Sequence, residues 1–286
     1  MIYIRREALK GALRLIFQVY MTIETLVVTV DQNDHRLVDQ MNIQTDVLIG
    51  NQCLRDTIEN FTVNGNAATC FCTTDRGVGV NRNLLLDKSK ADVCVLADDD
   101  MTFIDGYPEI AKQALRECPD ADVVIFNLIE KNPQRYIIKK KIRVRWYNYS
   151  KYGAARIAFK RDSINNAGIR FNQSFGGGAY YCSGEDSVFL RDCLKKGLHI
   201  YAVPYALAQI DQESKSTWFK GYTERFFYDK GALYACLYKD FWFPFVLRFV
   251  LKRVKKLNGS ISVAAALSSA VKGAKEYKAL TTEEKS

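Results

Sequence analysis

Three consecutive aspartates, Asp98, Asp99 and Asp100, are the strongest candidates in this sequence for binding a divalent cation. They follow the apolar run DVCVLA in the segment ADDDM. Carboxylate oxygens suit Mg²⁺ or Mn²⁺, and such an ion can bridge the phosphates of a nucleotide, which then supply further ligands. Acidic triplets also occur in ordinary turns. Taken alone, this one is either a turn or half of a phosphate-metal site.

A second acidic pair, Glu185 and Asp186, follows the glycine-rich stretch GGGAYYCSG and begins a predicted helix that ends near Gly197. Ser183 and Asp186 resemble a capping box, so a purely structural role is one interpretation. Neighbouring residues point in different directions, which makes the pair unsuitable for two carboxylates flanking one glycosidic bond. One base that removes an acceptor's proton, together with a distant metal that stabilises a leaving phosphate, suits group transfer better.

Short apolar runs alternate with helix-like stretches from Leu26 onward, which is a β-α repeat. The runs are TLVVTV, DVLIG, ATCFC, DVCVLA and DVVIFNL, and the helix-like stretches are residues 35–44, 54–61, 79–88 and 108–117. Continuous apolar strands suit a parallel sheet that is covered on both faces. We therefore predict an α/β fold with a doubly wound, mostly parallel sheet flanked by helices, and a polar crevice at the carboxyl ends of its strands.

Other nucleotide-binding motifs are excluded by position. The dinucleotide fingerprint and the P-loop both need a glycine-rich turn after the first strand, because backbone N–H groups must approach the phosphates. GVGVN, residues 77–81, follows the third strand instead.

The formal net charge of +9 favours an anionic partner. Basic residues between Lys131 and Arg161 are either a solvated sheet edge, with IRVRWYNY as an edge strand, or a contact for phosphates or lipid headgroups.

An aromatic-rich, basic segment at residues 241–256 reads FWFPFVLRFVLKRVKK, which is too short and too charged to span a bilayer. It is predicted as an interfacial helix on anionic lipid, with a core-packing helix as the alternative. No stacking platform or reading helix accompanies these charges, so we expect no nucleic-acid partner.

Residues 1–20 are basic and amphipathic, and Met21 stands just before the first strand. Either translation starts at Met21 or these residues form a surface helix. No signal peptide is evident, and the eight cysteines are scattered without metal-binding spacing. We therefore expect a cytoplasmic protein with reduced cysteines, held peripherally at the inner face of the cell membrane.

The combination of motifs resembles the inverting glycosyltransferases of family 2, which have the GT-A fold. ADDDM follows the fourth strand and RGVGVNRN precedes it, with RIAFKRDSINNAGIRFN and SGEDSVFL further along the chain. The resemblance covers roughly residues 25–218, and bacterial enzymes that build capsular or other surface polysaccharides look most similar. It implies metal-dependent transfer, with Mn²⁺ or Mg²⁺, from a nucleotide sugar to a saccharide or lipid-linked saccharide.

The resemblance also implies roles for individual residues. The predicted metal ligands are Asp100 and Asp98, the catalytic base is Asp186, and Glu185 orients the acceptor or the base. The predicted donor-binding residues are Val30, Asp31, Asn51, Arg82, Asn83, Asp98 and Asp99.

Two departures from the family pattern concern the donor. VDQND replaces the usual loop after the first strand, and Asn51 stands where an aspartate would contact the base. A UDP-sugar is the expected donor, and another nucleotide is the alternative. The same departures motivate a second hypothesis, a catalytically silent relative that binds saccharide or acts as a scaffold.

The predicted organisation has three parts. Residues 1–21 are an N-terminal extension and residues 22–217 are the GT-A domain, with a nucleotide-sugar half at 22–101 and an acceptor half at 102–217. Residues 218–286 are a basic, aromatic-rich helical region at the membrane surface.

Overall fold

The computed structural model describes residues 21–132, 135–211, 221–256 and 260–283. The predicted N-terminal extension, except Met21, and the predicted boundary between residues 217 and 218 lie outside these ranges. The chain divides into two compact units, each described by itself. The first takes its described residues from Met1–Asp75, Asn81–Arg170 and Asp192–Glu213, and the second takes them from Arg76–Val80, Phe171–Arg191 and Ser214–Ser286.

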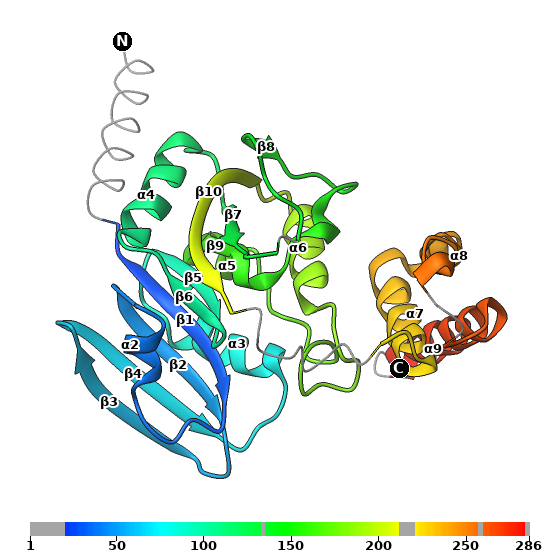
Figure 1. Ribbon diagram of the computed structural model, residues 1–286, viewed down its shortest axis with the longest axis horizontal. Coiled ribbons are helices and arrows are strands. Elements are labelled where there is room, and N and C mark those ends of the chain that lie inside the picture. The colour runs from blue at the N-terminus through cyan, green and yellow to red at the C-terminus, as the bar shows by residue number, and fades with distance from the viewer. Residues whose placement is uncertain (1–20, 133–134, 212–220, 257–259, 284–286) are drawn as a thin grey trace. The chain divides into compact units, whose positions relative to one another are not determined.

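The first unit is built on a mixed sheet, which has ten strands within the described residues. Its strands are β1 (Ile23–Val30), β2 (Asp46–Gln52), β3 (Thr57–Val63), β4 (Asn66–Thr73), β5 (Val93–Asp98), β6 (Met101–Phe103), β7 (Val123–Ile129), β8 (Ile142–Arg143), β9 (Ile157–Lys160) and β10 (Ile200–Ile210). They lie in the order β3-β4-β2-β1-β5-β9-β7-β10-β6, and β8 pairs with β10 (Figure 1). This confirms the predicted α/β sheet flanked by helices.

The centre of the sheet is parallel because its strands are apolar on both faces. β1 pairs in parallel with β2 on one side and with β5 on the other, and β2 pairs in parallel with β4. Five consecutive residues of β5 are buried, and β1 is buried over most of its length. β9 runs antiparallel to both β5 and β7, so β7 and β10 point the same way as β5.

Helices lie between the strands along the chain, and two of them, α3 and α6, begin in the second unit. They are α2 (Leu37–Gln40), α3 (Val78–Lys88), α4 (Tyr107–Glu117), α5 (Arg161–Asn166) and α6 (Glu185–Lys195), with 3₁₀ turns η1 (Tyr149–Lys151) and η2 (Ala154–Arg156). Helix α4 is amphipathic: Tyr107, Ala111, Ala114 and Leu115 are buried at helical spacing. The helices predicted over 79–88 and 108–117 are confirmed, whereas the stretch 35–44 forms only the short α2.

The helix-like stretch over residues 54–61 is a wrong prediction, because Thr57 to Val63 form β3. Leu54, Ile58 and Phe61 have helical spacing, yet Leu54 is 89% exposed and Ile58 is 63% exposed. The stronger signal is the Asn64-Gly65 pair that follows. Both residues have positive φ, 50° and 82°, as a tight hairpin turn requires, and β3 pairs antiparallel with β4 through this turn.

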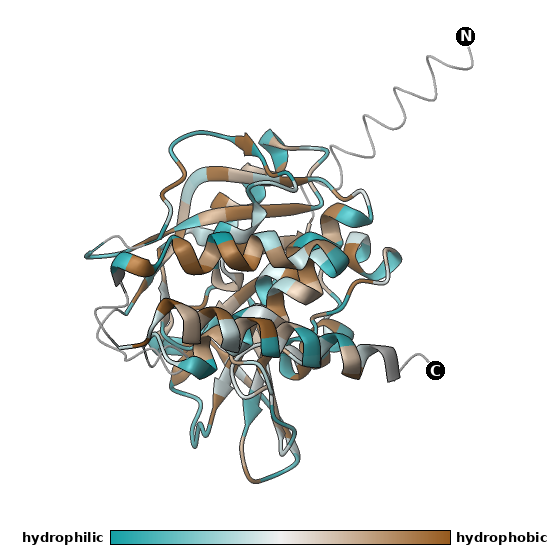
Figure 2. Cartoon of the chain, turned by 90° about the vertical axis from the view of Figure 1, so that its right-hand side faces the viewer, coloured by the Kyte–Doolittle hydropathy of each residue, from teal (hydrophilic) through white to brown (hydrophobic). Residues whose placement is uncertain are grey.

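The second unit contains the C-terminal helices. They are α7 (Glu224–Tyr238), η3 (Lys239–Phe241), α8 (Trp242–Leu251), η4 (Val254–Lys256) and α9 (Val263–Glu283). The Thr223 hydroxyl caps α7 by accepting a hydrogen bond from the Phe226 N–H. A separate apolar core joins these helices through Phe226, Phe227, Val246, Phe249, Val250, Ala266 and Ala270. Hydrophobic and hydrophilic residues alternate along the helices, as amphipathic packing requires (Figure 2).

Helix α8 has one face in this core and another in solvent. Val246, Phe249 and Val250 are buried, while Phe241 just before the helix is 76% exposed and Phe243 is 46% exposed. The core-packing alternative therefore accounts for only one face of the segment. In the described part of the chain, no helix is long and apolar enough to cross a membrane.

Helices α7 and α9 approach so closely that each needs a glycine. A Cβ added at Gly231 would overlap the carbonyl oxygen of Ala270, and one added at Gly273 would overlap that of Tyr228. Both obstacles are backbone atoms, which cannot move aside as a flexible side chain can.

We predict that Gly231→Ala destabilises the protein, with a loss of about 1–3 kcal/mol from overpacking. This loss outweighs the roughly 1 kcal/mol by which alanine is normally favoured over glycine within a helix. Thermal unfolding measures the change. Gly177→Ala is the matched control, because a Cβ there meets nothing within 4 Å. An unchanged or raised midpoint for Gly231→Ala would contradict the proposed close approach.

Candidate functional site

The aspartate triplet lies at the carboxyl end of β5, in the first unit. Asp98 is the last residue of the strand, and Asp99 and Asp100 form the turn into β6. The parallel register sets Asp98 opposite Val28 of β1. The next residue of β1, Thr29, therefore reaches the turn, and its hydroxyl donates to the Asp99 carboxylate at 2.5 Å.

Asp98 is held by a buried arginine. An Nη2 hydrogen of Arg82 bonds to Asp98 Oδ1 at 2.7 Å, and the Arg82 side chain is only 3% exposed. A buried guanidinium is costly unless it is paired, so this ion pair fixes the position of the carboxylate. The preceding residue, Asn81, donates from Nδ2 to the Gly50 carbonyl of β2 at 2.6 Å. A Cβ at Gly50 would overlap the Asn81 side chain, so only glycine permits this bond.

Asp100 differs from the other two aspartates in its surroundings. Its Oδ1 atom is buried and has no hydrogen-bond partner. Burial, reinforced by the neighbouring charges of Asp98 and Asp99, raises the pKa of this carboxyl to about 6. A carboxylate that is buried without a partner is costly, and a divalent ion would offset that cost.

A complete protein cage for such an ion is not present among the described residues, where no group of three or more His, Cys, Asp or Glu converges. Mg²⁺ commonly binds one or two carboxylates and takes its other ligands from water and substrate phosphates. The acidic turn fits an ion bound in that manner, with Asp100 as the available ligand. One oxygen of Asp98 is already engaged by Arg82.

Asn51, at the end of β2, holds the loop that follows β1. It is 1% exposed, its Nδ2 donates to the Gln32 carbonyl at 2.8 Å, and its Oδ1 accepts from the Gln32 N–H at 3.0 Å. In the same loop Asp31 has a positive φ of 53°, and Val30 is 51% exposed. The Asn51 amide thus shapes the loop on which the predicted base-binding residues lie.

The second acidic pair lies in the second unit, in the first turn of α6. Asp186 Oδ1 accepts from the Ser187 N–H at 2.5 Å, and Glu185 Oε2 accepts from the Gly184 N–H at 3.1 Å. Both carboxylates therefore bond backbone groups at the helix start, where the macrodipole favours negative charge. Lys230 Nζ of α7 donates to the Ser183 hydroxyl oxygen at 2.8 Å.

Several residues with a part in these arrangements were not predicted from the sequence. Thr29, Asn81 and Gly50 lie in the first unit, and Asp229 and Lys230 lie in the second. A signal for Asn81 was present in the sequence, because its amide side chain stands directly before Arg82 in the glycine-containing motif GVGVNRN. Asp229 and Lys230 are neighbours in an aromatic-rich helical segment, and the sequence around them does not indicate which distant residues they contact.

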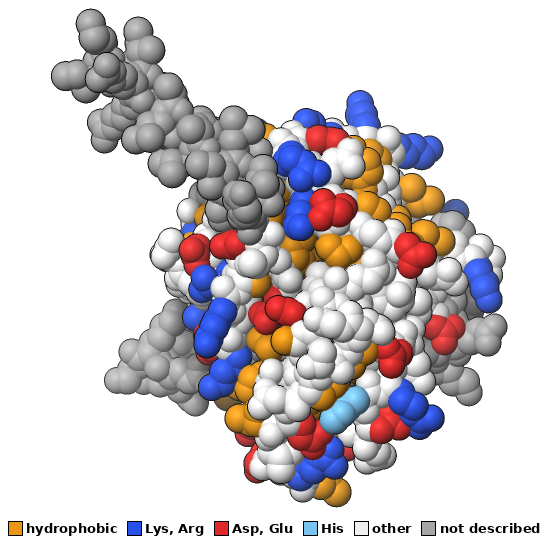
Figure 3. Space-filling view, turned by 90° about the vertical axis from the view of Figure 1, so that its left-hand side faces the viewer, with side chains coloured by type: hydrophobic (Ala, Val, Ile, Leu, Met, Phe, Trp, Pro, Cys, Tyr) orange, Lys and Arg blue, Asp and Glu red, His pale blue; other side chains and the backbone are white. Residues whose placement is uncertain are grey.

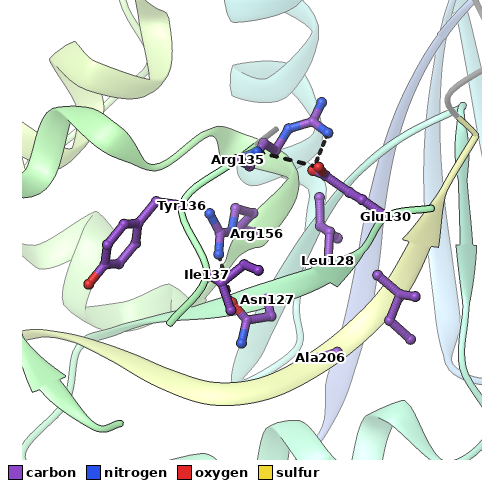
Figure 4. A pocket seen from close by; sticks show the side chains of 9 residues that line it. Asn127, Leu128, Glu130, Arg135, Tyr136, Ile137, Arg156 and Ala206 are labelled. Carbon is purple, nitrogen blue, oxygen red and sulfur yellow. Dashed lines mark hydrogen bonds and ion pairs between the residues drawn. The ribbon is translucent and has the colours of Figure 1, made fainter. Parts of the chain in front are cut away.

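A pocket of about 240 Å³ lies in the first unit, at the end of β7 (Figure 4). Arg156 borders it, with Nε donating to the Phe126 carbonyl at 2.6 Å and Nη2 donating to Asn127 Oδ1 at 3.0 Å. At its edge Arg135 pairs with Glu130 at 2.6 Å.

The basic residues between 131 and 161 were predicted either to be solvated or to contact phosphates or lipid. The lysines among them that are exposed fit a solvated edge, but Arg156 does not, because it is only 3% exposed. The predicted edge strand IRVRWYNY is wrong beyond β8, because a turn closed by Asn148 and Arg145 follows it.

The structure thus brings Asp98, Asp99, Asp100 and Arg82 to one edge of the first unit, with Asn83 buried on α3. Glu185 and Asp186 share one helix turn in the second unit. Acidic and basic side chains lie interspersed on the face shown in Figure 3, so the net positive charge is not gathered into one field there.

No family model matches the sequence, and no curated protein matches it. Solved structures do match. S. aureus TarS 1–349 in complex with UDP-GlcNAc has a TM-score of 0.58 and 14% identity, over 82% of this chain and 73% of that chain. The same TarS fragment in complex with UDP has a TM-score of 0.58 and 14% identity, over 88% and 81% of the two chains.

The solved structure of a second protein also matches this chain. The mannosyltransferase PcManGT from Pyrobaculum calidifontis, in complex with GDP-Man and Mn²⁺, has a TM-score of 0.50 and 15% identity, over 93% of this chain and 84% of that chain. At such identities the likeness concerns the fold. The chain has the GT-A glycosyltransferase fold, as its motifs predict.

Proposed function

We propose that this protein is an inverting, metal-dependent glycosyltransferase of family 2. It moves a sugar from a nucleotide-sugar donor to a hydroxyl of a lipid-linked or growing saccharide, in the synthesis of a cell-surface polysaccharide. The observation that carries the proposal is the buried, unpartnered Oδ1 of Asp100 at the carboxyl end of β5. In open α/β sheets that edge is where ligands bind. Structural neighbours hold UDP-GlcNAc, UDP, or GDP-Man with Mn²⁺.

On the donor side, the loop after β1 with Val30 and Asp31 receives the nucleotide base, and Asn51 fixes that loop through Gln32. Arg82 and Asn83 of α3 support the donor, with Arg82 setting the position of Asp98. Asp100 and Asp98 would hold a divalent ion, which would supply charge stabilisation for the leaving diphosphate.

On the acceptor side, Asp186 is the base. Glu185 and Asp186 are adjacent on a helix and point apart, so a single carboxylate takes the proton from the acceptor hydroxyl while the other orients it. One base and no covalent sugar-enzyme intermediate give direct displacement, which inverts the configuration at the sugar carbon.

The membrane-facing surface is the exposed side of α8. Phe241, Phe243 and Leu251 are exposed beside the exposed Arg248 and Lys252. Apolar side chains flanked by cations suit an anionic lipid surface, such as the inner face of a cell membrane. Arg253 belongs to the core instead, because its guanidinium lies 3.5 Å from the centre of the Phe249 ring.

Asp100→Asn is predicted to stabilise the ligand-free protein at pH 7.5 by on the order of 1 kcal/mol. The folded pKa of Asp100, about 6, exceeds its unfolded value, so its ionisation costs stability as pH rises from about 4 to about 6. The advantage of Asn should therefore be complete above pH 6 and absent below about pH 4. Thermal unfolding across this pH range measures it.

The same variant tests the metal ligand. Mn²⁺ with UDP at about 100 times the dissociation constant should stabilise the wild type by about 2.7 kcal/mol, and Asp100→Asn should lose most of this gain. Asp162→Asn, which alters an exposed aspartate paired with Arg161, is the control. Equal stabilisation of all three proteins would rule out Asp100 as a ligand.

Asp186→Asn should lower the transfer rate by about 10²–10⁴, because the amide cannot accept the proton. Donor affinity, measured by calorimetry with UDP-, GDP- and dTDP-sugars plus Mn²⁺, should stay within a few-fold of wild type. A variant that keeps the full transfer rate would show that another residue is the base. Binding of no donor by the wild type would instead favour a catalytically silent protein.

Membrane association predicts a loss of vesicle binding in the Phe241→Ser, Phe243→Ser double variant. Removing two exposed aromatic rings should weaken binding to phosphatidylserine vesicles about tenfold or more. Trp146→Ser with Tyr147→Ser is the matched control, because this exposed pair lies in the first unit. Equal effects of the two double variants would place the lipid contact elsewhere.

A further inference from the structure

Helix α7 packs against the segment that leads into the acidic pair, and all of these residues belong to the second unit. Asp229 Oδ2 accepts from the Cys182 N–H at 3.2 Å, and Lys230 Nζ bonds the Ser183 hydroxyl at 2.8 Å. Gly184 has φ of +122°, and a Cβ there would overlap the Leu233 side chain. The three residues before Glu185 are thus each held by α7.

One helix face makes these contacts. Cys236 of α7 extends them, because its carbonyl accepts a hydrogen bond from the Arg191 guanidinium of α6. Positions 229, 233 and 236 follow the i, i+4, i+7 spacing of one helix face, and 230 lies beside them. The location of Asp186 is therefore set by α7 as well as by α6 itself.

Lys230 adds charge to this contact. Burial lowers the pKa of its ammonium group, and the Asp186 carboxylate is the strongest influence in the opposite direction. Cys182 and Glu185 also raise this pKa, whereas Arg253 lowers it. On α7 itself, Asp229 is 1% exposed and pairs with Arg225 Nε at 2.9 Å, so its charge is already matched.

Electrostatic coupling between two groups is mutual. If the Asp186 carboxylate favours the protonated form of Lys230, the ammonium of Lys230 favours the ionised form of Asp186 by the same free energy. The hydrogen bond from Lys230 Nζ to the Ser183 hydroxyl, 2.8 Å long, holds the ammonium group beside the first turn of α6. The nearby Asp186 carboxylate stabilises the ammonium form of Lys230.

We propose that Lys230 is a positioning residue, which holds Asp186 ionised through its charge and holds the preceding loop in place through Ser183. The C-terminal helices are then part of the catalytic apparatus as well as a docking surface. This inference rests on the proposed function, because that function makes Asp186 the base.

The first test is the pH dependence of transfer by full-length protein. Lys230→Met removes the charge, so the acidic limb of the kcat profile should move to higher pH by about one unit, with about tenfold slower turnover below the limb. Lys230→Arg should keep the limb near its wild-type position. Lys278→Met, which breaks the exposed pair with Asp240 on the same unit, should not move it.

A purely structural lysine predicts a different result. Loss of folded protein would scale the rate equally at every pH and leave the limb unmoved, and that outcome would overturn the proposal. If Lys230→Met does not fold, Lys230→Gln replaces it, because Gln keeps a donor for Ser183 but carries no charge.

A second test needs no turnover. Carbon-13 labelling of aspartate carboxyl groups, with the Asp186 signal assigned from Asp186→Asn, reports the titration of Asp186 directly by NMR. The midpoint should rise in Lys230→Met and Lys230→Gln but not in Lys278→Met. An unchanged midpoint refutes the role of Lys230. A raised midpoint in a protein that transfers no sugar would refute the proposed function and keep the electrostatic coupling.

Discussion

The buried guanidinium of Arg82 is the constraint on which the arrangement of the first unit depends. At 3% exposure it must be paired, and its partner is Asp98 at the end of β5. The residue before it, Asn81, bonds β2, so two successive side chains of α3 fix the helix to strands on either side of β1. The acidic turn is thereby anchored at the edge where parallel strands end.

This anchoring leaves the three aspartates with different roles. Asp98 is neutralised by Arg82, and Asp99 is hydrogen-bonded by Thr29. Asp100 alone combines burial, two acidic neighbours and an oxygen without a partner. Carboxyl groups with a pKa perturbed in this way cluster at functional sites. In the second unit, helix α7 fixes the segment before Asp186, because it contacts Cys182, Ser183 and Gly184.

The strands were predictable where burial on both faces makes the sequence continuously apolar, as in β1 and β5. Prediction failed where a half-exposed strand resembled a helix. Residues 54–61 have apolar side chains at helical spacing, but pairing with β4 and the Asn64-Gly65 turn decide their conformation. Helical periodicity predicts burial, and here two of those side chains are exposed instead.

The type of fold and the positions of both acidic motifs could be predicted from the amino-acid sequence, because they follow from local periodicity and from which residues end an apolar run. For residues 241–256 the sequence predicts an interfacial helix, and this stays a prediction. The partners of the site residues became known from the folded chain: Arg82 for Asp98, Gln32 for Asn51, and Ser183 for Lys230. These pairs are 16, 19 and 47 residues apart in the chain. No local pattern encodes them, since they arise when the sheet order and the packing of α7 bring distant residues together.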